Sequence, residues 1–244
     1  MAERAAAFVD RESVGRDLGR DASRSPRWLF ALRRAARHLK KLPVSQILHQ
    51  LDITTSAWLI PDSQYRRLAA ARVSSATGYP RSVIEDALIE TFSRLRAPVL
   101  NRLLKAELGD PRMLDTFVRY PGGRIHAVGP DLMLQIYAGN IPGPPVLTLA
   151  YGLLAKSAII GKVAAEEPIL APLFLKSLRE FAPALGACVR IMAWRGGDES
   201  IESALYKAAD LVVAFGSDAT IRSIRDRLPA HTRFIAYGHR ISFG

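Results

Sequence analysis

Asn140 is the residue of this chain whose type and setting most clearly suggest chemistry. It lies in a turn, residues 139–145 (GNIPGPP), whose prolines stiffen the backbone and whose glycines let a ligand approach it closely. The apolar run 132–137 before the turn is typical of a buried strand, and the run 146–156 after it is typical of a buried helix. Open α/β sheets place ligand-binding groups at such turns, although turn geometry alone also explains this composition.

Two further strand ends carry polar residues. Lys162 ends an apolar, strand-like run that precedes a helix starting at Pro168, and a lysine there can extend to solvent or bind a ribose or phosphate. Gly216 and Ser217 open a helix after the apolar run 211–215, where free backbone N–H groups and the helix dipole favour an anion. Ser217 is equally suited to act only as a helix N-cap.

The elements that must position these residues change in character near residue 120. Up to there the pattern predicts mainly helices, over 28–42, 63–76 and 81–108, with a break in the last one at Pro98. After it, short β-branched runs alternate with helical ones. Strands are expected at 124–128, 132–137, 157–163, 189–194, 211–215 and 232–236, the first two pairing around the turn 129–131.

This alternation predicts an α/β protein in which a mainly helical region, 1–120, precedes an α/β domain, 121–244, with a doubly wound, mainly parallel, Rossmann-like sheet. Such a sheet binds ligands at the carboxyl ends of its strands, where Asn140, Lys162 and Ser217 are expected. The fingerprint G-x-G-x-x-G is absent from the sequence, which argues against an ordinary Rossmann dehydrogenase.

The composition limits the chemistry further. Hydrophobic residues make up 49% of the 244 residues, enough to bury a full core. The single cysteine, Cys188, permits no intramolecular disulfide, and its apolar surroundings predict a small buried side chain rather than a nucleophile. The histidines are scattered, so a metal site is not indicated. Neither a transmembrane segment nor a signal peptide is recognisable, so we expect a cytoplasmic location.

The formal net charge of +11 favours anionic partners such as nucleic acids, phosphates or anionic lipids. Basic residues gather at 24–41, where a solvated helix face is favoured over a nucleic-acid site. Neither an aromatic ladder nor a nucleic-acid motif accompanies them, so a nucleic-acid partner is not favoured. A basic nucleic-acid-binding protein remains an alternative that rests on charge alone.

Several motifs follow one another in order between residues 120 and 244. They are 139–143 (GNIPG), 153–158 (LLAKSA), 161–168 (GKVAAEEP), 194–198 (WRGGD), 215–218 (FGSD) and 237–243 (YGHRISF). In this order they resemble the LuxC-type family of long-chain fatty acyl-CoA reductases, known from bacterial bioluminescence. The family belongs to the aldehyde dehydrogenase superfamily, whose enzymes bind a nicotinamide dinucleotide on such a sheet and use a cysteine nucleophile.

The resemblance implies roles for individual residues. Asn140 falls where the superfamily has an asparagine of the oxyanion hole, a preorganised donor for a thiohemiacetal oxyanion. Lys162 falls where a lysine binds the adenosine ribose, and Gly216 and Ser217 fall where the pyrophosphate meets a turn and helix start. The residues 121–244 would therefore form a dinucleotide-binding domain.

The resemblance also implies NADPH as the cofactor. Many NAD-preferring relatives have a glutamate three residues after the ribose-binding lysine, and here that position is Ala165. Loss of the carboxylate removes a repulsion against a 2′-phosphate. Glu166, the next residue, is the competing candidate for contact with the ribose.

Two catalytic groups of the superfamily have no counterpart here. The general-base glutamate aligns with Ala236, and the nucleophilic cysteine is expected downstream of 237–243, whereas Cys188 precedes that motif. The chain is thus expected to be the N-terminal, cofactor-binding portion of an NADPH-dependent reductase, inactive alone. The parent enzyme would reduce long-chain acyl-CoA or acyl-carrier thioesters to aldehydes through an acyl-cysteine intermediate.

The alternative is a non-catalytic module of the same fold that binds a dinucleotide or a partner. The oligomeric state is left open, with a homo-oligomer among the partners considered. A superfamily member covers the cofactor domain with its catalytic domain, so we expect the isolated chain to expose an apolar patch and to self-associate.

Overall fold

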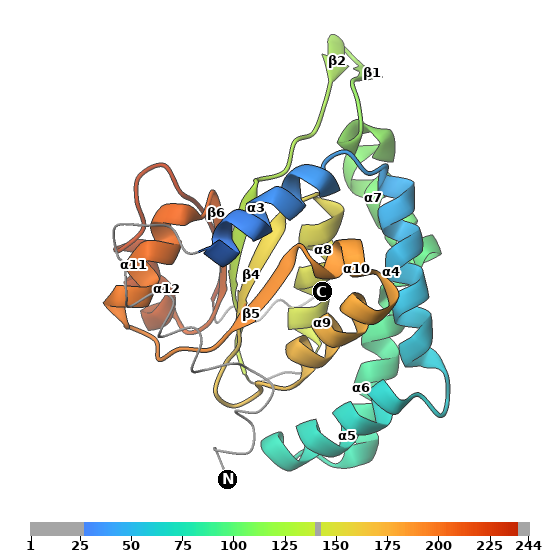
Figure 1. The fold of residues 1–244 in the computed structure, drawn as a ribbon, viewed down its shortest axis with the longest axis vertical. Helices are drawn as coiled ribbons and strands as arrows, with labels where there is room; N and C mark the ends of the chain where they lie inside the picture. The colour runs from blue at the N-terminus through green and yellow to red at the C-terminus, as the bar shows by residue number, and fades with distance from the viewer. Residues whose placement is uncertain (1–26, 140–142, 239–244) are drawn as a thin grey trace.

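The computed structural model describes residues 27–139 and 143–238, and within these ranges a helical part is followed by a parallel sheet between helices (Figure 1). The helical part consists of α3 (Arg27–Leu39), α4 (Val44–Leu59), α5 (Gln64–Thr77), α6 (Arg81–Arg94), α7 (Ala97–Leu108) and the 3₁₀-helix η2 (Pro111–Leu114). The predicted break near Pro98 is confirmed, because this proline lies in the first turn of α7, where its missing N–H costs no helical hydrogen bond.

The sheet contains β3 (Leu132–Ile136), β4 (Ala158–Lys162), β5 (Val189–Met192), β6 (Leu211–Phe215) and β7 (Arg233–Tyr237), in the order β5-β4-β3-β6-β7. All four pairings are parallel. The helices between the strands are α8 (Pro144–Leu154), α9 (Leu170–Phe181), α10 (Pro183–Gly186), α11 (Glu199–Ala208) and α12 (Asp218–Arg225). The predicted α/β class and the mainly parallel sheet are confirmed.

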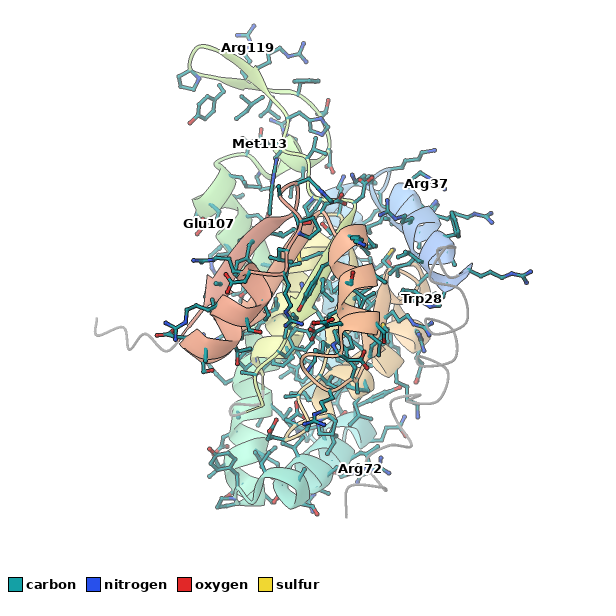
Figure 2. All side chains as sticks on the ribbon, turned by 90° about the vertical axis from the view of Figure 1, so that its left-hand side faces the viewer. Trp28, Arg37, Arg72, Glu107, Met113 and Arg119 are labelled. Carbon is teal, nitrogen blue, oxygen red and sulfur yellow. The ribbon has the colours of Figure 1, made fainter. Side chains whose placement is uncertain are left out.

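The predicted pairing of strands around the turn 129–131 is wrong. A short hairpin forms earlier, where β1 (Val118–Tyr120) pairs with β2 (Gly123–Ile125) in antiparallel orientation. This hairpin projects from the body of the molecule (Figure 1), with Arg119 far from the sheet (Figure 2). β3 instead enters the centre of the large sheet, because its five residues are all buried and need cover on both faces.

Two buried clusters lie on opposite faces of the sheet. On one face α8 and α9 pack against the strands, and α4, α5 and α6 pack behind them (Figure 1). On the other face α3, α11 and α12 cover the strands. The predicted basic helix is α3, whose apolar side is buried while Arg34 and Arg37 are exposed, as expected for a solvated helix face.

Within residues 27–139 and 143–238, one part of the sheet has no helix over it on the α8 face. A groove of about 370 Å³ lies between α8 and strands β6 and β7, lined among others by Leu147, Tyr151, Val213, Ile235 and Tyr237. Tyr151, Ile235 and Tyr237 are exposed large hydrophobic side chains. The expected apolar patch is therefore present, and self-association through it stays a prediction.

Candidate functional site

The carboxyl ends of β3, β4 and β6 meet at one edge of the sheet. Ile136 of β3 is in register with Lys162 of β4 on one side and with Ala214 of β6 on the other. β4 and β5 lie on one side of β3, and β6 and β7 lie on the other. After β5 the chain therefore returns to the middle of the sheet and adds its next strands on the opposite side of β3, with all strands still parallel. Doubly wound sheets bind ligands at such a switch point.

Lys162 lies half-buried at the end of β4. Its ammonium stands over the ring of Trp194, 5.4 Å from the ring centroid. Burial lowers the pKa of Lys162, while the carboxylates of Glu202 and Glu166 act in the opposite direction. A cation held on an aromatic face at a strand end can bind the hydroxyls of a sugar or an anion.

Gly216 and Ser217 connect β6 to α12 as predicted. The Ser217 hydroxyl accepts a hydrogen bond from the backbone N–H of Thr220 at 3.2 Å, so it caps the helix. A cavity of about 530 Å³ opens beside this helix start, lined by Asp218, Arg222, Tyr237 and other residues of α12 and β7. The helix N-terminus and Arg222 favour an anion there, whereas the Asp218 carboxylate opposes one.

Gly139 and Gly143, on either side of Asn140, both lie close to side chains of other segments. Asn140 lies outside the described residues, but both ends of its turn are described. A side chain at Gly139 would come within 2.8 Å of the Glu166 carboxylate. Gly143 has a φ of +112°, and a Cβ there would lie 2.6 Å from the Thr91 hydroxyl of α6. Glycine is therefore required at both ends of the turn.

Ala165 and Glu166 are both exposed in the loop after β4. The Glu166 carboxylate lies close to Gly139, which follows the neighbouring strand β3. The neighbouring Glu167 is buried and caps α9, accepting hydrogen bonds from the N–H groups of Ile169 at 2.9 Å and Leu170 at 2.8 Å. Burial raises the pKa of Glu167 to about 7, while these two bonds act in the opposite direction. The sequence reasoning did not identify this cap.

Cys188 is buried directly before β5, as predicted for a small apolar side chain. Its thiol lies 3.4 Å from the carbonyl oxygen of Ala184. Burial raises the pKa of the thiol to about 12, so the thiolate that a nucleophile needs is disfavoured.

In the part of the chain that the structure describes, no group of three or more His, Cys, Asp or Glu side chains is arranged to hold a metal ion. None of the helices in residues 27–139 and 143–238 combines the length and the hydropathy that crossing a membrane requires.

The sequence also matches known proteins. The model of the family described as acyl-CoA reductase (LuxC) matches residues 39–244. A long-chain acyl-protein thioester reductase of Vibrio harveyi is 21% identical over 210 residues, which cover 84% of this chain and 44% of that protein. A second such reductase, from Photobacterium leiognathi, is 21% identical over 83% of this chain and 43% of its own length. The chain spans less than half the length of these curated relatives.

Solved structures of aldehyde dehydrogenases share the fold. The NADP-dependent glyceraldehyde-3-phosphate dehydrogenase of Bacillus halodurans, complexed with NADP, superposes with a TM-score of 0.66 at 12% identity, over 86% of this chain and 43% of that one. Betaine aldehyde dehydrogenase of Staphylococcus aureus, in complex with NAD⁺, gives a TM-score of 0.67 at 15% identity, over 86% and 41% of the two chains. At these identities the likeness concerns the fold alone.

Proposed function

We propose that this chain, which belongs to the acyl-CoA reductase (LuxC) family, binds NADPH and forms the cofactor-binding part of a thioester reductase. The parent enzyme reduces long-chain acyl-CoA or acyl-carrier thioesters to aldehydes through an acyl-cysteine intermediate. The observation that carries the proposal is the register of β3, β4 and β6, which brings Lys162 and the Gly216–Ser217 turn to the same edge of a parallel sheet.

The donor set at this edge fits a dinucleotide. Lys162, at the end of β4, would bind the adenosine ribose, and the start of α12 at Gly216 and Ser217 would receive the pyrophosphate. Asn140 supplies the oxyanion-hole donor, from the segment outside the described residues. Bound NADPH supplies the hydride for the reduction. The division into a helical region 1–120 and a dinucleotide-binding domain 121–244, and a cytoplasmic location, belong to the same proposal.

NADPH is expected to bind at least about tenfold more tightly than NADH. Ala165 leaves the ribose free of a facing carboxylate, and the Glu166 side chain lies beside Gly139. A charge-assisted contact to the 2′-phosphate is worth roughly 1.5–3 kcal/mol, which corresponds to about tenfold or more. Isothermal titration of both cofactors measures the ratio.

The matched variant for this test is Ala165→Glu, which restores a carboxylate at an exposed position. It should weaken NADPH binding and spare NADH binding. Equal affinities of the unsubstituted chain for NADPH and NADH would contradict the assignment of NADPH.

Cys188→Ala is expected to leave NADPH affinity unchanged, and the 244-residue chain is expected to show no thioester reduction in either form. The reason is the buried thiol of Cys188, whose raised pKa disfavours the thiolate. NADPH oxidation with tetradecanoyl-CoA, followed spectrophotometrically, tests both statements. If the unsubstituted 244-residue chain shows turnover and Cys188→Ala does not, Cys188 is the nucleophile and its structural role is overturned.

A further inference from the structure

Glu202 is a buried carboxylate with an unusually complete set of donors. It lies in α11 with only 3% of its surface exposed. One oxygen, Oε1, accepts hydrogen bonds from the indole N–H of Trp194 at 3.0 Å and from the backbone N–H of Gly197 at 3.2 Å. The other oxygen, Oε2, is paired with the Arg227 guanidinium. Glutamates are rarely buried to this degree unless they are paired, so these contacts hold the carboxylate in place.

The groups that Glu202 joins come from separate elements around the proposed cofactor site. Trp194 follows β5, and its ring lies beneath the Lys162 ammonium at the end of β4. Arg227 follows α12, and its Nε donates to the backbone oxygen of Ser223 within that helix at 2.8 Å. One carboxylate therefore connects the ring under the lysine with the helix whose first residues are assigned to the pyrophosphate.

We propose that Glu202 is a positioning residue of the dinucleotide site. It fixes the Trp194 ring on which the Lys162 ammonium rests, and it ties α12 to the same point. The proposal rests on the proposed function, in which Lys162 binds the adenosine ribose. Glu202 has no contact with the cofactor in this role and acts through Trp194 and Lys162.

The physical reason is preorganisation. A lysine side chain loses considerable rotamer freedom when it binds a ligand, and a side chain that is already held in its bound position loses less. Trp194 can position Lys162 only if its own ring is fixed. The hydrogen bond from the indole N–H to Glu202 fixes the ring. The carboxylate also acts on the charge of Lys162 directly.

The charges that face Lys162 come from two sides. Glu202 reaches it from α11 and Glu166 from the loop after β4, and both oppose the effect of burial on its pKa. The Arg227 guanidinium is paired with Glu202 and offsets part of the negative charge of that carboxylate. Loss of the Glu202 charge therefore lowers the pKa of Lys162, so that the ammonium is lost at a lower pH.

The test is Glu202→Gln in the full chain. The NADPH dissociation constant is measured by isothermal titration from about pH 7 to about pH 10, on the acid side of the ordinary lysine pKa of about 10.4. We expect binding about three- to tenfold weaker at neutral pH, where a preorganised cation has been lost. The alkaline loss of affinity should move down by about half a pH unit to one unit. Glu199→Gln is the matched control, because Glu199 is exposed on the same helix, and it should change neither quantity.

Trp194→Phe provides a second test in case Glu202→Gln folds poorly without a counter-charge for Arg227. A phenyl ring keeps an aromatic face under Lys162 but removes the N–H that binds Glu202. NADPH binding should weaken, as in Glu202→Gln. The pH at which affinity is lost on the alkaline side should stay unchanged, because the Glu202 charge remains. An unchanged affinity in Trp194→Phe would overturn the positioning role.

A double-mutant cycle with Lys162→Ala separates this inference from the proposed function. If Glu202 acts through Lys162, Glu202→Gln has almost no further effect on affinity in the Lys162→Ala background. Additive effects would overturn the inference while leaving Lys162 as the cofactor ligand. If Lys162→Ala alone leaves NADPH affinity unchanged, the proposed function itself fails at this residue, and the positioning role fails with it.

Discussion

Lys162→Ala is expected to weaken NADPH binding about ten- to hundredfold while the thermal midpoint of unfolding stays nearly unchanged. Loss of a hydrogen bond from a charged donor costs roughly 1.5–3 kcal/mol of binding free energy, which gives this range of affinities. Lys162 lies at the end of β4 rather than within the apolar core, so its truncation removes little folding energy. Isothermal titration and a thermal melt of the same preparation measure the two quantities.

Lys207→Ala serves as the control for net charge, because Lys207 is exposed on α11. It should alter NADPH affinity by less than about twofold, as expected for a screened surface charge. A lowered midpoint combined with unchanged affinity in Lys162→Ala would show that the lysine is structural.

Trp58→Ala is expected to lower the free energy of unfolding by about 3–5 kcal/mol. Trp58 is 0% exposed and stacks on Phe92 with ring centroids 4.2 Å apart. Its indole N–H donates to the Ser177 hydroxyl of α9 at 2.8 Å. The substitution therefore leaves a cavity, and it also removes the donor that binds the Ser177 hydroxyl.

Urea unfolding followed by circular dichroism measures this loss. Phe30→Ala is the matched aromatic control, since Phe30 is 63% exposed on α3, and it should change stability by less than about 0.5 kcal/mol. A loss below about 1.5 kcal/mol in Trp58→Ala would mean that the surrounding side chains collapse into the space.

The same unfolding curve tests the division at residue 120, which stays a prediction. Trp58 and Phe92 lie before this boundary, and Phe174 and Ser177 lie after it, yet they contact one another in a single buried cluster. A shared core of this kind favours one cooperative transition over two. Two separate transitions would support independent domains.

The sequence predicted most of the sheet because period and length distinguish its elements well. The buried runs that became β3, β4 and β6 are short and apolar, and helical runs separate them. α4 (Val44–Leu59) was not predicted, and its buried residues include Thr54, Thr55 and Trp58 as well as aliphatic ones. The partner of β3 was predicted wrongly because alternation within a strand does not specify its neighbour.

The site was predictable where a strand end marks it and not where partners meet only in three dimensions. Lys162 and Ser217 were identified from the rule that parallel strands bind ligands at their carboxyl ends, and the structure brings those ends together. Glu202 and Arg227 lie in none of the motifs quoted above, and Trp194 was noted only as part of the motif 194–198. Glu202 and Arg227 are 25 residues apart in sequence and form one buried pair, which no spacing rule would have indicated.

The central position of β3 has a consequence for the newly made chain. β3 pairs with β4 on one edge and with β6 on the other, and its link to Asp210 spans 78 residues. At a translation rate of about 5–20 residues per second, the β6 edge of β3 waits roughly 4–16 s for its partner to leave the ribosome. An apolar strand edge is a template for aggregation during that interval, so slower translation or chaperone depletion should raise the insoluble fraction of this protein.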